Sequence, residues 1–249
     1  MPNRSNHDSA GQVSVSGNAY AFVFGGNTDR LEGAEIGIAE FPEIGTVAGP
    51  DGDYRLQVPD RALITPYVSM PGYHRTYLQT FFTCGRDLER VNFQTPEENV
   101  YNAMAEIVGA ERDPESNELL GSAVVSTFFQ KEGRDFSDFD AFHDFRPHGI
   151  ADAKARLVDR NGASPVEPVY FNSEVIPTPE LDRSTGDGGV LWANLPEGDY
   201  TVTGSHADLR FSSFRATCRP GRLVNANPPW GLFELAPGED ENASTGAEG

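Results

Sequence analysis

Four histidines are the residues of this chain whose chemistry best suits a metal. His74 and His206 each follow a glycine-containing segment, and His143 and His148 lie close together in one segment. Neutral imidazole is the commonest nitrogen ligand of transition metals. These four residues therefore form a candidate site for Fe, Zn or Cu, although their spacing matches neither HExxH nor HxH. The alternative is a set of loop histidines that are hydrogen-bonded to the backbone.

A group of acidic residues surrounds two of these histidines, namely Asp135, Asp138, Asp140 and Asp144. Paired carboxylates on either side of a cleft would suit glycoside hydrolysis, and clustered carboxylates would suit Ca²⁺, but the segment has no EF-hand spacing. A solvated acidic loop has the same composition. The chain contains no Gly-x-Ser-x-Gly elbow for a hydrolytic serine, so no catalytic residue is assigned.

Four aromatic residues are candidates for binding a ligand: Trp192, Trp230, Tyr73 and Tyr77. Trp230 lies in the rigid sequence Asn-Pro-Pro-Trp, where an exposed indole beside asparagine side chains would suit stacking on a sugar ring. Burial against the core is the alternative for both indoles. The aromatic residues therefore favour a binding module for carbohydrate or for a protein partner.

The charge of the chain narrows the range of partners. Its 38 acidic and 19 basic residues give a net charge of −19 in 249 residues. Binding to nucleic acid or to an anionic membrane needs clustered lysine and arginine, so neither partner is expected. No apolar run reaches the roughly 20 residues that span a bilayer.

The compartment and the cysteine chemistry stay open. Residues 1–8 lack the apolar core of a signal peptide, so the chain would be extracellular or periplasmic if a leader were removed and cytoplasmic otherwise. Cys84 and Cys218 are the only cysteines. They are too few for a cysteine-rich zinc site and would form either a disulfide or two separate thiols.

Most of the chain has the pattern of short β-strands. Residues 34–38 and 54–58 alternate between apolar and polar side chains, and Asp51-Gly52 just before the second segment is typical of a tight turn. A helix is predicted over residues 95–109, with Thr95 as N-cap, Pro96 at the first helical position and Glu98 completing a capping box. A second, short helix is predicted over residues 137–142.

The chain also contains an internal repeat. Asp51-Gly52 and Asp187-Gly188 each precede a strand, and Thr83-Cys84 and Thr217-Cys218 follow at similar distances. Residues 19–24, 33–36 and 72–74 likewise parallel residues 124–129, 152–155 and 204–206. We therefore expect a flexible N-terminus (1–16), a first β-sandwich (17–92), a helical linker (93–120), a second β-sandwich with insertions (121–235) and a disordered acidic tail (236–249).

These motifs resemble the carboxypeptidase regulatory-like domain. The resemblance rests on residues 31–36 (Leu-Glu-Gly-Ala-Glu-Ile) followed by an Asp-Gly-x-Tyr turn, and on residues 195–200 (Leu-Pro-Glu-Gly-Asp-Tyr), which are similar to a hairpin of collagen-adhesin B-type modules. It implies an all-β fold of two tandem Greek-key sandwiches of the transthyretin (prealbumin) type, joined by the helix. Such modules act as spacers, adhesion units, carbohydrate-binding modules or accessory domains, so the resemblance implies no single activity.

A second resemblance bears on the metal. Intradiol ring-cleavage dioxygenases have a similar sandwich and hold Fe(III) with two tyrosines and two histidines, and Tyr73, His74, Tyr77 and Tyr170 stand near candidate positions. The chain lacks the His-x-His pair of that family, which weighs against the same iron chemistry. We therefore expect a non-catalytic binding or interaction module. The alternative is a metal-dependent enzyme, dioxygenase-like or hydrolytic, with its site between the repeats.

Overall fold

The computed structural model describes residues 11–22, 29–131 and 149–239. In these residues the chain forms short strands and the helix α1 (Glu98–Ile107), so the expected all-β character is confirmed. The strands are β1 (Gln12–Phe22), β2 (Glu35–Ile38), β3 (Phe41–Val47), β4 (Asp53–Pro59), β5 (Leu63–Ile64), β6 (Pro66–Ser69), β7 (Thr76–Tyr77), β8 (Phe81–Phe82), β9 (Phe93–Pro96), β10 (Ser122–Thr127), β11 (Lys154–Asp159), β12 (Val169–Phe171), β13 (Pro177–Thr178), β14 (Gly189–Leu195), β15 (Gly198–Ser205), β16 (Phe214–Cys218) and β17 (Leu223–Ala226).

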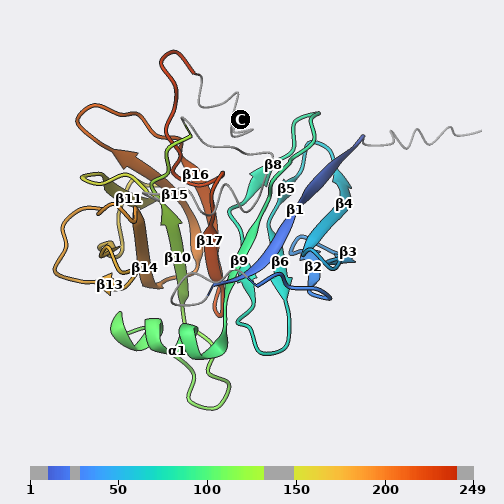
Figure 1. Ribbon diagram of the computed structural model, residues 1–249, viewed down its shortest axis with the longest axis horizontal. Coiled ribbons are helices and arrows are strands. Elements are labelled where there is room, and N and C mark those ends of the chain that lie inside the picture. The colour runs from blue at the N-terminus through green and yellow to red at the C-terminus, as the bar shows by residue number, and fades with distance from the viewer. Residues whose placement is uncertain (1–10, 23–28, 132–148, 240–249) are drawn as a thin grey trace, which may run out of the picture.

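One nine-stranded sheet runs through both halves of the chain, of which the first contains β1–β9 and the second β10–β17. Its order is β13-β12-β14-β10-β17-β7-β6-β2-β3, so the first half contributes one end and the second half the other. The two parts meet where β17 pairs in parallel with β7, with Leu223 opposite Thr76. Figure 1 shows the two halves side by side, with β9 and β17 in the middle. We refer to this sheet as the shared sheet.

Two three-stranded sheets, β4-β1-β9 and β11-β15-β16, cover opposite faces of the shared sheet. Ile36, Val68, Thr76 and Leu223 stand opposite one another on β2, β6, β7 and β17, so their side chains share one face. Ile36 and Val68 pack into the first core, together with residues of β1, β4 and β9. Val224, the next residue of β17, points to the other face and packs with residues of β11, β15 and β16 in a second core.

The helix α1 covers the outer face of the shared sheet in the second half. Met104 and Val108 pack against the buried cluster of Phe171, Leu191 and Ala193. The helix therefore acts as a cover on one face of a sheet whose other face is already packed against β11-β15-β16.

The start of α1 differs from the prediction. The helix runs over Glu98–Ile107 with Glu97 at the N-cap, and no side chain caps it. Thr95 belongs to β9, where its hydroxyl donates to the carbonyl of His74 (3.0 Å). The predicted capping box is wrong, because the pairing of β9 with β1 holds Thr95 in extended backbone. Gly109 follows the helix with φ of +61°, as expected of a terminating glycine.

The Asp-Gly turns of the two halves make matching backbone contacts. The N–H of Ala19 donates to the carbonyl of Gly52 (2.7 Å), and the N–H of Phe128 donates to the carbonyl of Gly188 (2.9 Å). Gly52 and Gly188 have positive φ angles of +69° and +80°, which favour glycine. A Cβ at either position would lie within 2.5 Å of the carbonyl oxygen of Ala19 or Phe128. Both turns therefore hold the following strand against the first strand of its own half.

A second pair of contacts matches as well. Gly33 donates to the carbonyl of Ala48, and Asp152 donates to the carbonyl of Ser184, each at 2.9 Å. The strand order also agrees, since β1 and β10 each pair with an antiparallel strand on one side and a parallel strand on the other.

Some segment boundaries differ from the expected ones. β1 begins at Gln12, within the segment expected to be flexible, and β9 lies within the expected linker but pairs with β1. The predicted helix over 137–142 and most of the acidic tail lie outside the described residues. Cys84 is exposed, Cys218 is buried and both are free, so the disulfide alternative does not apply.

Candidate functional site

His74 lies against α1, just before β7. Its ring is buried and stacks on the ring of Tyr101, with centroids 3.7 Å apart and planes 5° apart. Its Nε2 is buried and has no hydrogen-bond partner among the described atoms. Burial, assisted by the charge of Arg75, lowers the pKa of His74 to about 4, so the imidazole is neutral at pH 7.

His206 lies elsewhere, after β15 in the sheet β11-β15-β16. Its Nδ1 accepts a hydrogen bond from the backbone N–H of Asp208 (3.1 Å), as the loop alternative predicts. The strand registers place His206 at the position of Met70 in the first half. His74 and His206 are therefore not equivalent in the two halves, because the similar Gly-containing segments before them differ in register.

The other candidate metal ligands are only partly visible. His143 and His148 lie outside the described residues. Within the part of the chain that the structure describes, no group of three or more His, Cys, Asp or Glu side chains is arranged to hold a metal ion. Tyr170 packs in the second core, where its hydroxyl accepts a hydrogen bond from the backbone of Ala155 (2.9 Å).

The two tryptophans occupy packing positions. Trp192 on β14 is fully buried in the second core, so it presents no surface to a ligand. Trp230 is half-buried and packs against the first core, with its ring edge-on to Phe81 at a centroid distance of 5.1 Å. Its indole N–H donates to the carbonyls of Glu89 and Arg90, so the C-terminal segment of the second half is attached to the first.

The two candidate tyrosines lie in different surroundings. Tyr73 is half-buried beside the first core, and burial raises its pKa. Tyr77 stands opposite Tyr67 of β6, on the same face of the shared sheet as Val224, and its ring packs against the second core. Here the structure brings Tyr77 together with Tyr67, Arg75 and Arg222. We call these four residues the arginine–tyrosine ladder.

The ladder consists of two diagonal pairs on neighbouring strands. The guanidinium of Arg222 lies 4.6 Å from the centroid of the Tyr77 ring, and that of Arg75 lies 5.4 Å from the centroid of the Tyr67 ring. The two tyrosine centroids are 5.6 Å apart. Each arginine thus reaches from its own strand to the tyrosine of the next strand, within the range of a cation–π contact.

The two arginines of the ladder lie side by side. Leu223 and Thr76 are opposite each other in the parallel pairing of β17 with β7, and Arg222 and Arg75 come directly before them. Within the described residues, neither arginine forms an ion pair with a carboxylate. Two positive charges without a carboxylate partner therefore lie next to each other in a strongly acidic protein. This arrangement is unfavourable, because like charges on adjacent strands repel.

The ladder lies beside the second core, where Tyr77 packs, and extends over a glycine on β2. A Cβ at Gly37 would lie 2.5 Å from Cζ of Tyr67, so the Tyr67 ring lies along the sheet over this glycine of the neighbouring strand. Gly45, opposite Gly37 on β3, is exposed. Arg75 is exposed, and Tyr67, Tyr77 and Arg222 are half-buried, so the ladder is partly accessible from solvent.

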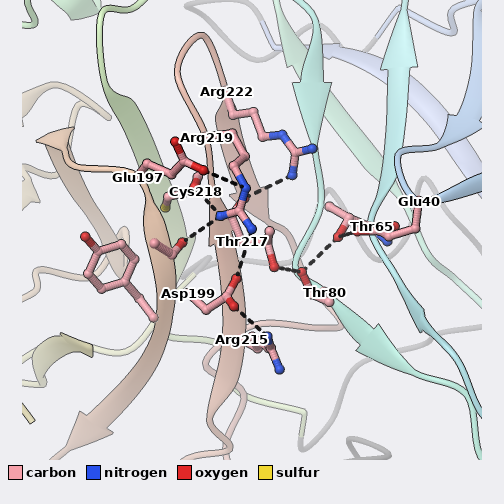
Figure 2. A network of polar contacts seen from close by, with 12 residues as sticks. Glu40, Thr65, Thr80, Glu197, Asp199, Arg215, Thr217, Cys218, Arg219 and Arg222 are labelled. Carbon is pink, nitrogen blue, oxygen red and sulfur yellow. Dashed lines mark hydrogen bonds and ion pairs between the residues drawn. The ribbon is translucent and has the colours of Figure 1, made fainter. Parts of the chain in front are cut away.

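Arg222 also belongs to a polar network that joins the two halves (Figure 2). Its Nη1 donates to the carbonyl of Thr217 (3.2 Å), and the hydroxyl of Thr217 accepts from Thr80 (2.7 Å). The hydroxyls of Thr80 and Thr65 are 2.9 Å apart, and Thr65 donates to the Glu40 carboxylate (2.7 Å). The three threonines are buried. The hydrogen bond from Arg222 to the Thr217 carbonyl therefore attaches the guanidinium to a buried part of the structure.

Arg215 on β16 and Arg219 just after it differ from the arginines of the ladder because carboxylates neutralise them. Asp199 accepts from Arg215 at 2.8 Å and pairs with Arg219 at 3.7 Å, and Arg219 also reaches Glu197 at 3.4 Å (Figure 2). These pairs are about half exposed and contribute little to stability. Arg75 and Arg222 differ from Arg215 and Arg219 in that neither has a carboxylate partner among the described residues.

Further side-chain contacts join the two halves along the shared sheet. The amide of Asn227 donates to the hydroxyl of Tyr20 (2.9 Å), and the amide of Asn225 donates to the carbonyl of Gln94 (2.9 Å). Together with Trp230, these contacts attach the C-terminal segment of the second half to the first half. The ladder therefore lies on a surface whose two contributing halves are held in one arrangement.

Tyr77 is the one ladder residue that the sequence predicts to bind a ligand. The available signal was the alternation of residues 66–69, and of Arg75 and Tyr77, which places each set on one strand face. The position of Arg222 carries no such signal, because its neighbour β7 is distant in the sequence.

The comparisons with known proteins identify no family. No protein-family model matches the chain, and no curated protein matches it. Among solved structures, the chain is similar to the minor pilin GBS52 of Streptococcus agalactiae, at 7% identity over 90% of this chain and 97% of that one, with a TM-score of 0.29. It is also similar to the shaft pilin SpaA of Lactobacillus rhamnosus GG, at 9% identity over 91% of this chain and 100% of that one, with a TM-score of 0.26.

A third match is the Bacillus anthracis TIE protein, at 12% identity and a TM-score of 0.27. The match covers 88% of this chain but only 34% of that protein. At these identities and TM-scores, none of the matches carries an argument about the ligand or partner of this chain.

Proposed function

We propose that this protein is a non-catalytic interaction module that binds its partner through the arginine–tyrosine ladder. The observation that carries the proposal is the accessible pairing of Tyr67 and Tyr77 with two arginines that have no carboxylate partner among the described residues. Tyrosine and arginine are the residues that most often dominate binding surfaces, because they offer large planar groups together with polar tips. The neutralised Arg215 and Arg219 lack this combination.

The joined halves support the same proposal. A ligand that lies across β6, β7 and β17 would contact residues from both halves, since Arg222 comes from the second half and the other three ladder residues from the first. The polar network and Trp230 hold these strands together before any ligand binds. A surface that is already ordered loses little conformational entropy on binding.

The proposal is tested with a panel of neutral and acidic polysaccharides and with poly-L-glutamate and poly-L-lysine, measured by affinity electrophoresis. We expect Tyr67→Ala to abolish binding to any probe that the unchanged protein retains. Tyr73→Ala is the matched control, because Tyr73 is also half-buried and lies off the ladder. Loss of binding in the Tyr73 variant alone, or no retention by any probe, would contradict the proposal. Thermal melting of each variant checks that it is folded.

We also infer that the two halves are tandem copies of one prealbumin-like sandwich. The matching contacts of Gly52 and Gly188 support this inference, as does the common strand order. If the glycines are equivalent, Gly52→Ala and Gly188→Ala should each lower the free energy of unfolding by more than about 2 kcal/mol. Gly33→Ala is the control, because Gly33 has positive φ but open space around it, and should cost only about 1 kcal/mol. Tolerance of either of the first two substitutions would oppose the inference.

A metal-dependent enzyme, dioxygenase-like or hydrolytic, is the second candidate function. The observation that favours it is the buried Nε2 of His74, which has no hydrogen-bond partner among the described atoms. Elemental analysis of the purified protein tests it. Near-stoichiometric iron, zinc or copper that is lost in a variant with His74, His143, His148 and His206 replaced by alanine would establish the metal site. A metal content that is unchanged by these replacements would reject it.

A further inference from the structure

The side-by-side arginines point to the charge of the ligand. Arg75 and Arg222 occupy adjacent positions at the same end of β7 and β17, where like charges are unfavourable. Each side chain is held over a tyrosine ring, and Arg222 is also tied to the Thr217 carbonyl. An anionic group between the two guanidinium groups would relieve the repulsion and would find both donors already oriented.

We propose that the ladder binds a uronate-containing polysaccharide, with a sugar carboxylate on Arg75 and Arg222 and sugar rings against the edges of Tyr67 and Tyr77. This inference rests on the proposed function and specifies its ligand. A guanidinium group matches a carboxylate because it can donate two parallel N–H bonds to the two oxygens. The remaining N–H groups of the arginines and the tyrosine hydroxyls are available for sugar hydroxyls.

The bare backbone beside Tyr67 favours a sugar ring. The Tyr67 ring lies over Gly37, and the exposed Gly45 continues the bare backbone beside it. A glycine lacks the side chain that would otherwise stand up beside the ring, so a pyranose can lie against the edge of the Tyr67 ring while Arg75 stays over its face. The tyrosine centroids are 5.6 Å apart and the ring planes are inclined by 44°, so one ligand can reach both rings.

The position of the ladder within the sheet disfavours an acidic peptide. Peptides that bind β-proteins commonly add a strand to a free sheet edge. β6 pairs with β2 and β7, and β7 pairs with β6 and β17, so neither strand that carries the tyrosines has a free edge. A ligand here must be recognised through side chains on a sheet face, which suits a polymer of rings.

The net charge of the protein limits the affinity that we expect for a polyanion. A net charge of −19 repels a polyanion at long range, so attraction comes only from the ladder at short range. Glu35 lies on the same face, at the start of β2, and limits the positive region to the side of Arg75 and Arg222. We therefore expect binding to a short oligomer that fits the ladder, without the steep avidity of a basic protein for long polyanions.

The test compares three probes by isothermal titration calorimetry: hexagalacturonate, its fully methyl-esterified form and poly-L-glutamate of similar length. We expect binding to hexagalacturonate only. Arg75→Gln and Arg222→Gln should each weaken it at least tenfold. Arg55→Gln on β4 and Arg156→Gln on β11 remove the same charge from other exposed strand positions and should leave it unchanged. Thermal melting of each variant shows whether a loss of binding comes from misfolding.

Each other outcome has a definite meaning. Equal binding of the methyl ester, or equal loss in all four arginine variants, would overturn the assignment of the carboxylate to the ladder. Binding of poly-L-glutamate instead would make the partner an acidic peptide and would overturn the sugar assignment. If hexagalacturonate fails while another polysaccharide binds in a Tyr67-dependent manner, this inference is wrong and the proposed function stands. If no probe binds at all, both are wrong.

Discussion

The imidazole of His74 lies flat against the phenol ring of Tyr101, with centroids 3.7 Å apart and planes 5° apart. This stack joins the start of β7 to α1. Because the side chain is 5% exposed and its Nε2 has no hydrogen-bond partner among the described atoms, the folded protein has no place for a second proton on this ring. The contact is therefore favourable only while His74 is neutral.

The first prediction concerns pH. Burial lowers the pKa of His74 from 6.5 to about 4 in the folded protein, so between these values the unfolded chain takes up a proton that the folded chain does not. The contribution of His74 is complete above pH 6.5 and is lost as the pH falls toward 4, by about 3 kcal/mol. Urea unfolding of the wild type and of His74→Phe at pH 7.5, 6.0 and 5.0 measures it. The phenylalanine variant keeps a ring on Tyr101 and should lose less stability with acid, and identical pH slopes would refute this account.

The second prediction concerns the buried hydroxyls between the halves. Thr80→Val keeps the shape of the side chain but removes the hydroxyl that contacts both Thr65 and Thr217. Two buried hydroxyls then lose a partner, which should lower the free energy of unfolding by about 1–3 kcal/mol. Thr201→Val on the exposed side of β15 is the control and should change it by less than about 0.5 kcal/mol. Equal effects in the two variants would show that the network does not stabilise the junction.

The third prediction concerns Trp230. Trp230→Ala removes a ring that packs on Phe81 and an N–H that donates to two carbonyls, so we expect a loss of about 3 kcal/mol in the free energy of unfolding. Trp230→Phe keeps most of the packing and should lose about 1 kcal/mol. Differential scanning calorimetry measures both variants. A Trp230→Ala protein as stable as the wild type would mean that the C-terminal segment is not held in this way.

The fourth prediction concerns the thiols. Cys84 is exposed, whereas Cys218 is buried and burial raises its pKa to about 12. Thiolate is the reactive form, so Cys218 should be inert toward a disulfide reagent in the folded protein. Titration with 5,5′-dithiobis(2-nitrobenzoate) should detect one thiol in buffer and two in guanidinium chloride. The Cys84→Ser variant should show none in buffer, and a rapid reaction of that variant would place Cys218 at the surface.

The parts of the fold that could be predicted are those set by local chemistry. The turns at Asp51-Gly52 and Asp187-Gly188 need positive φ at the glycine, and this requirement is visible in the sequence. Thr95 shows the opposite case, because its local sequence is a capping box but its pairing partner lies in β1, far away in the chain. Tertiary pairing overrode the local preference there.

The candidate site was harder to predict for the same reason. The aromatic character of Tyr77 makes it a candidate, but its partners depend on the parallel pairing of β17 with β7 and on the ring of Tyr67 lying over Gly37. Neither relationship has a local signal. Trp192 shows a different limit of sequence-based prediction. Residue type alone cannot distinguish an indole in the core, as Trp192 is, from one on the surface.

In each half, the first strand pairs with the last strand, and this pairing has a mechanical consequence. β1 runs parallel to β9, and β10 runs parallel to β17. The chain therefore enters the first strand of each pair at one end and leaves the second strand at the opposite end. Tension applied to those ends would shear all the bonds between the two strands at once instead of opening them one after another. Since β17 is also paired with β7, a pull on the second half would be passed directly into the sheet of the first, and the two halves would resist the load as one body.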